Sequence, residues 1–156
     1  MRYLPNGKQM SEADAHTIHK IGIPSLVLME RAALQIVETM QKKNISTEKS
    51  LIVCGSGNNG GDGFAVARLL TEQGKHADVL FAGREASLSE ECRCQKQIVE
   101  NMGISVFTEF PDEEYTVIID AVFGVGLCRE ITGHYKDVID WMNLQDAEKV
   151  AVDIPS

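Results

Sequence analysis

Short apolar runs alternate with amphipathic segments along most of the chain, and this alternation predicts its secondary structure. Runs of four to six mainly apolar residues, rich in Val, Ile and Leu, are typical of buried strands. The expected strands are 51–54, 77–82, 104–107, 116–121 and 149–154. Between them, apolar residues recur at three- and four-residue spacing, which predicts helices at 64–73, 89–102 and 135–142. Strands that alternate with helices pair in parallel through right-handed crossovers, so the pattern predicts a three-layer α/β/α fold with a mainly parallel sheet.

Two further helices are predicted before the first strand. Ser11 and Asp14 resemble a capping box with Asp in place of Glu, and they open a helix that Gly22 ends. A second helix begins near Ser25 and ends at Lys42. Its apolar positions recur at helical spacing, which predicts one buried face. These positions are Leu26, Met29, Ala33, Ile36, Val37 and Met40.

The length of the chain limits the number of domains. The 156 residues are enough for one hydrophobic core and too few for two ordinary domains. The last predicted strand runs into Pro155 and Ser156, where the chain stops. A compact domain rarely ends on the first residues of a loop that follows a core strand. We therefore expect one domain over residues 1–156 that is truncated at its C-terminus.

Composition excludes several classes of partner. The formal net charge of -8 disfavours nucleic acid, because phosphate backbones require clustered Lys and Arg. No apolar run is long enough to span a bilayer, and residues 1–10 lack the apolar centre of a signal peptide. The four cysteines lack the spacing of zinc sites, and we interpret them as reduced thiols of a cytoplasmic protein. They are Cys54, Cys92, Cys94 and Cys128.

The segment at residues 54–63, CGSGNNGGDG, is the strongest candidate for a binding site. Gly55, Gly57 and Gly60 fit the G-x-G-x-x-G pattern of Rossmann-like folds, in which backbone N–H groups and a helix N-terminus hold a phosphate. That pattern does not explain the polar half that follows. An aspartate beside a pyrophosphate repels it unless a cation lies between them. Alternatively, Asn and Asp do no more than tolerate left-handed turn conformations here.

A plain NAD-dependent dehydrogenase is disfavoured by the second predicted strand. Such enzymes usually place an Asp or Glu at its end to hold the ribose hydroxyls. Here the strand ends in Leu80-Phe81-Ala82-Gly83-Arg84, although Glu85 follows. The Walker pattern G-x-x-x-x-G-K-[ST] is also absent from the sequence, which disfavours most nucleotide triphosphatases.

Four stretches resemble one known family in order along the chain. GSGNNGGDGFAVARLL closely resembles the signature of the YjeF N-terminal domain family, the NAD(P)H-hydrate epimerases. GIPSLVLMERAA, IDAVFGVGLCREITG and VAVDIPS resemble other motifs of the family. The resemblance implies an isomerase that interconverts the R and S epimers of hydrated NADH and NADPH at C6 of the nicotinamide ring. The dinucleotide is then a small-molecule substrate, not a redox cofactor.

The resemblance also implies site residues. Its potassium ion falls on Asn59, Asp120 and Ser156, whose amide, carboxylate and hydroxyl oxygens suit a hard cation. Its substrate contacts fall on Asn58, Asn59, Gly60, Gly61, Asp62, Gly124, Val125, Gly126, Leu127, Cys128, Arg129, Glu130 and Asp153. Alternatively, Asp120 is a strand-end residue that caps the following turn.

Asp153 is our candidate for the catalytic residue, and Asp62 is the second. Inverting C6 requires its bond to hydroxyl to break and reform, or the ring to open, and both routes need a group that gives and takes a proton. Burial raises the pKa of a carboxyl group toward neutrality, which suits it to this task. Alternatively, Asp153 is a structural residue bonded to nearby loop amides.

One departure from the family and two alternative functions accompany this hypothesis. Many members have Asn where this chain has Arg31, so no role of that asparagine transfers here. Some YjeF N-terminal domains serve as non-catalytic interaction or dimerisation modules, which is the main alternative, and a Rossmann oxidoreductase is the weaker one.

Family members are often dimers, and the broad apolar face of the helix at 25–40 agrees with a homodimer. Bacterial bifunctional members carry a second, dehydratase domain, with which the truncated end is compatible.

Overall fold

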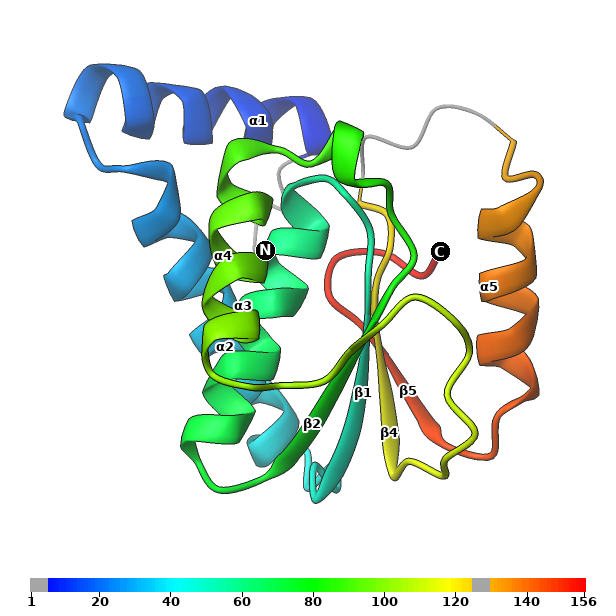
Figure 1. Ribbon diagram of the computed structural model, residues 1–156. Helices are drawn as coiled ribbons and strands as arrows, with labels where there is room; N and C mark the ends of the chain where they lie inside the picture. Colours follow the sequence, from blue (N-terminus) through cyan, green and yellow to red (C-terminus); the bar gives the residue numbers. More distant parts are fainter. Residues whose placement is uncertain (1–5, 125–129) are drawn as a thin grey trace.

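A parallel sheet forms the centre of the molecule. The computed structural model describes residues 6–124 and 130–156, and within them five parallel strands pair in the order β3-β2-β1-β4-β5 (Figure 1). The strands are β1 (Lys49–Cys54), β2 (His76–Phe81), β3 (Val106–Phe107), β4 (Val117–Ala121) and β5 (Glu148–Ala151). The predicted α/β fold with a parallel sheet is thus confirmed. The last strand is shorter than predicted, because its pairing with β4 ends at Ala151.

Helices cover both faces of the sheet, as Figure 1 shows. One face packs against α3 (Asn58–Glu72) and α4 (Glu90–Asn101), with α2 (Ser25–Lys42) beside α3. The other face packs against α5 (His134–Leu144). Alternate residues of β1 enter the two cores: Ile52 faces α3, and Leu51 faces α5. Among the described residues, no helix has both the length and the apolar character needed to cross a membrane.

The first helix begins earlier than predicted. α1 (Gly7–His16) is capped by Asn6, whose side chain accepts a hydrogen bond from the backbone N–H of Gln9, while the Gln9 side chain accepts one from the Asn6 N–H. The capping box is therefore formed by Asn6 and Gln9 and not by the predicted pair of Ser11 and Asp14, which lie inside the helix. A π-helical segment, η1 (Thr17–Ile21), continues α1 as far as Gly22. A short 3₁₀ turn, η2 (Glu85–Ser87), precedes α4.

Candidate active site

Three segments meet where the strand order reverses. β1 and β4 are neighbours, and the chain leaves β1 for α3 on one face of the sheet but leaves β4 for α5 on the other. Ligands of open α/β sheets bind at such a point, beyond the carboxyl ends of the strands. The glycine-rich segment follows β1, residues 122–124 follow β4, and residues 152–156 follow β5. All three segments contain residues to which the family resemblance assigns ion or substrate contacts.

The glycine-rich segment is mostly helix, so the helix predicted at 64–73 begins earlier than expected. α3 begins at Asn58, not near Phe64, and Gly57 is its N-cap. A Cβ at Gly60 would overlap the carbonyl oxygen of Gly55, so the first helical turn packs directly on the strand end. The N–H groups of the first turn have no acceptor within the helix, and they carry the positive end of its dipole. This end of α3 can bind an anion such as a phosphate.

An oxygen-rich hydrogen-bond network joins the three residues predicted to hold the cation. Asp120 at the end of β4 is buried, and its carboxylate accepts bonds from the Ser156 N–H at 2.7 Å, the Ser156 hydroxyl at 2.8 Å and the Val122 N–H at 3.2 Å. The Ser156 hydroxyl in turn accepts the Phe123 N–H at 3.1 Å. Asn59 donates its side-chain N–H to the Phe123 carbonyl at 2.7 Å. The peptide of Phe123 therefore links all three predicted ligands.

Two carboxylates lie close together beside this network. Burial, followed by the negative charges of Asp153 and Asp14, raises the pKa of Asp62 from 3.8 to about 7. Asp153 is exposed, and a Cβ on Gly124 would lie 2.9 Å from its Oδ2 atom. Asp14 comes from α1, which lies on the same side of the molecule as the carboxyl ends of the strands (Figure 1). The site thus holds one carboxyl group whose pKa lies near neutral pH next to a second, exposed one.

The remaining predicted contacts are placed in part. Gly60 and Gly61 are buried in the first turn of α3, whereas Asn58 and Glu130 are exposed. Val125, Gly126, Leu127, Cys128 and Arg129 lie outside the described residues. The structure thus brings together predicted residues from the β1, β4 and β5 ends.

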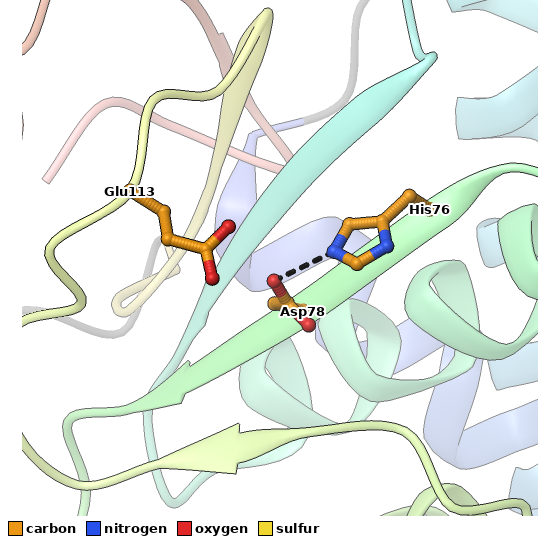
Figure 2. Close-up of side chains that lie close together, drawn as sticks. All are labelled: His76, Asp78 and Glu113. Atoms are coloured by element: carbon orange, nitrogen blue, oxygen red, sulfur yellow. Dashed lines mark hydrogen bonds and ion pairs between the residues drawn. The ribbon is translucent and has the colours of Figure 1, made fainter.

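A second cluster of metal-ligating side chains lies at the opposite end of the sheet and was missed by the sequence analysis. His76 and Asp78, at the start of β2, lie close to Glu113, and one ligand atom from each falls within 4.8 Å of the others (Figure 2). The spacing His-x-Asp on a strand, which places both side chains on one face, was the available signal. Asp78 accepts hydrogen bonds from His76 and Tyr115, and Glu113 pairs with Lys49 at 2.6 Å. Asp78 and Glu113 thus already have side-chain partners, and the cluster lies away from Asp62 and Asp120.

The chain resembles known proteins over almost its whole length. Residues 25–156 match the family model described as YjeF-related protein N-terminus. The chain is 42% identical to the NAD(P)H-hydrate epimerase of Oenococcus oeni, over 97% of this chain and 73% of that protein. It is 43% identical to the NAD(P)H-hydrate epimerase of Lentilactobacillus buchneri, over 96% of this chain and 70% of that protein. The crystal structure of yeast ynu0, YNL200c, has the same fold, with a TM-score of 0.82 and 20% identity over 99% of this chain and 71% of that one. The matched motifs and their arrangement at the switch point show that this chain belongs to the YjeF-related protein N-terminus family.

Proposed function

We propose that the protein is an NAD(P)H-hydrate epimerase, an isomerase that interconverts the R and S forms of hydrated NADH and NADPH. The observation that carries the proposal is the pair of carboxylates, Asp62 and Asp153, at the switch point of a dinucleotide-binding type of sheet. The names of the relatives support it, since both are NAD(P)H-hydrate epimerases. They favour it over a non-catalytic interaction module and over an oxidoreductase.

The two carboxylates suit proton transfer at C6 of the nicotinamide ring. Because the pKa of Asp62 is about 7, this group carries a proton about half of the time at neutral pH. Asp153 is exposed beside it and can contact a bound ring directly. Asp62 supplies its proton through Asp153 to the leaving hydroxyl, which departs as water; when water returns to C6, Asp153 takes up its proton and the pair is restored. Two carboxyl groups in different environments are a common basis for such acid–base pairs.

The start of α3 holds the pyrophosphate of the substrate in this proposal. Its free N–H groups and helix dipole attract the phosphate oxygens. Gly124 and Glu130, on either side of residues 125–129, complete the substrate contacts. The nicotinamide end then lies over β4 and β5, where Asp153 stands.

A potassium ion belongs to the same proposal, and the donor set fits it. Asp120 is a buried carboxylate that is bonded to neutral donors, and within the described residues no Lys, Arg or His pairs with it. Asn59 uses its N–H₂ group on Phe123, so its side-chain oxygen is left to bind a cation. Asn59, Asp120 and Ser156 would hold the ion, with backbone carbonyls completing its shell. When bound, the ion offsets the repulsion between the substrate's pyrophosphate and the carboxylates of the site.

The proposal extends to the state of the protein in the cell. Residues 1–156 belong to a single epimerase domain, and the reaction takes place in the cytoplasm, in keeping with the buried free thiols of Cys54 and Cys92. A homodimer forms through α2, whose exposed apolar side chains include Val27 and Leu34, which are 45% and 41% exposed.

The substitution Asp153→Asn tests the catalytic assignment. The amide keeps the size of the side chain but cannot transfer a proton at neutral pH, so conversion of the R epimer should slow by about 10²- to 10⁴-fold. Binding should change much less, because the α3 contacts to the pyrophosphate remain. Single-turnover epimerisation and direct binding are measured in potassium buffer, with the spontaneous rate subtracted. Asp146→Asn, an exposed carboxylate between α5 and β5, is the matched control. A rate for Asp153→Asn within a few-fold of the parent would refute the role and move it to Asp62.

A further inference from the structure

The turn after β2 is held against the glycine-rich segment. The N–H of Arg84 donates to the Ser56 hydroxyl oxygen at 2.7 Å, and the Ser56 hydroxyl lies 3.3 Å from the Arg84 carbonyl oxygen, to which it can donate. Gly83 allows this approach, because a Cβ at that position would overlap the Ser56 hydroxyl. Ser56 immediately precedes Gly57, the N-cap of α3. The backbone of Arg84 is therefore fixed beside the helix end that the proposed function assigns to the pyrophosphate.

In the turn after β2, Glu85 has an ion-pair partner and Arg84 can bind a ligand. Glu85, which could have held ribose hydroxyls, pairs with Lys96 of α4 at 2.8 Å, and its carbonyl oxygen accepts a bond from Arg93. Arg84 itself is exposed, and the described part of the chain provides no ion-pair partner for its guanidinium. Glu85 therefore does not neutralise the exposed guanidinium of Arg84.

The position of Arg84 after β2 indicates which ligand its charge binds. In dinucleotide-binding α/β folds, the residue at the end of the second strand contacts the adenosine ribose. An acid there holds the 2′-hydroxyl, whereas an arginine accommodates a 2′-phosphate. Here β2 pairs with β1, α3 follows β1, and Arg84 follows the end of β2 at Phe81, so Arg84 lies near that position. We infer that Arg84 binds the 2′-phosphate of hydrated NADPH, so that hydrated NADPH is preferred over hydrated NADH as substrate. This inference rests on the proposed epimerase function.

A pocket beside the same turn fits the adenine base. It has a volume of about 240 Å³, and Leu80, Ala82 and Val138 give it an apolar wall. Phe110, stacked on Trp141 at a ring separation of 4.9 Å, adds an aromatic edge. Apolar and aromatic walls with a few polar groups are typical of pockets that bind small molecules, and such walls can pack against the faces of a purine ring.

The acidic residues of the pocket favour the adenine base inside it and disfavour the 2′-phosphate there. Glu109 and Asp137 also line it, and their carboxylates can accept hydrogen bonds from the adenine amino group. The same charges repel a phosphate from the pocket interior. Arg84 lies two residues beyond Ala82, a span of about 7 Å at most, so the base enters the pocket while the 2′-phosphate stays on the Arg84 side.

The test compares the two hydrates as substrates of the parent and of Arg84→Gln. We expect the ratio of kcat/KM for hydrated NADPH to that for hydrated NADH to fall by about 10- to 100-fold, the loss typical of a hydrogen bond to a charged group. Arg84→Lys keeps the charge and should lose less of the ratio. Arg31→Gln, an exposed arginine on α2, removes the same charge elsewhere and should leave the ratio unchanged. A ratio in Arg84→Gln within threefold of the parent would overturn the inference.

A binding experiment separates this inference from the proposed function. Calorimetry with adenosine 2′,5′-bisphosphate and with AMP needs no turnover, and the bisphosphate should bind the parent at least about tenfold more tightly. Arg84→Gln should remove that difference. Equal affinities of the parent for the two nucleotides would overturn the role of Arg84 even if epimerisation is observed. Failure of the parent to epimerise either hydrate would instead refute the proposed function.

Discussion

The raised pKa of Asp62 makes the stability of the protein depend on pH in a defined direction. The unfolded chain releases this proton near pH 3.8, whereas the folded protein keeps it until about pH 7. Between these values the folded state binds more protons than the unfolded state, so this carboxyl group lowers stability as pH rises through the window. Above pH 7 the folded state must hold a largely buried charge beside Asp153.

Asp62→Asn removes that charge, and the structure sets the size of the effect. The rise in pKa from 3.8 to about 7 corresponds to about 4 kcal/mol at most. Only the part of this free energy that changes between pH 5 and pH 8 is measured. Water at the partly exposed side chain screens the charge and lowers the value further, to roughly 2 kcal/mol. The variant should therefore gain roughly 2 kcal/mol relative to the parent when the pH is raised from 5 to 8. With an m-value of about 2 kcal/mol/M, the urea midpoint should shift by about 1 M.

Urea unfolding followed by circular dichroism, at pH 5 and pH 8 and constant potassium, measures this difference. The matched control is Asp146→Asn, which removes an exposed carboxylate between α5 and β5 and should show no such gain. If the midpoints of Asp62→Asn and the parent differ equally at both pH values, Asp62 does not hold its proton to neutral pH. Its place in the proposed acid–base pair would then lose its basis.

Two further predictions concern the cation and the assembly. Asp120→Asn should weaken potassium binding and substrate binding together by about tenfold or more, because the buried charge is lost and the new amide N–H₂ faces the donors of Ser156. Unchanged affinities in titrations with and without potassium would contradict the role of Asp120 as an ion ligand. Light scattering at micromolar concentration should give twice the chain mass of 17.2 kDa, and Leu34→Glu on α2 should shift the protein toward the monomer; a parent that is monomeric at that concentration would refute the dimer.

Most of the fold follows from local pattern in the sequence. Strands such as 51–54 are short apolar runs because parallel strands are buried on both faces, and the apolar spacing of α2 follows from the helical repeat. The predicted order of strands and helices, and the three segments at the carboxyl ends, are present in the structure. The errors lie at element ends. α1 starts at Gly7 because Asn6 and Gln9 cap each other, and competing caps a few residues apart are hard to rank from sequence.

The residues of the candidate site were named from sequence, but their relations were decided by the tertiary structure. Asn59 contacts Phe123 across 64 positions, and Ser156 contacts Asp120 across 36. The pKa of Asp62 depends on burial and on charges from the far ends of the chain. That the glycine-rich segment begins a helix depends on how closely Gly60 packs on Gly55. Periodicity and turn propensity report on neighbours in sequence, whereas desolvation, hydrogen bonding and charge at a site depend on which distant segments the sheet brings together.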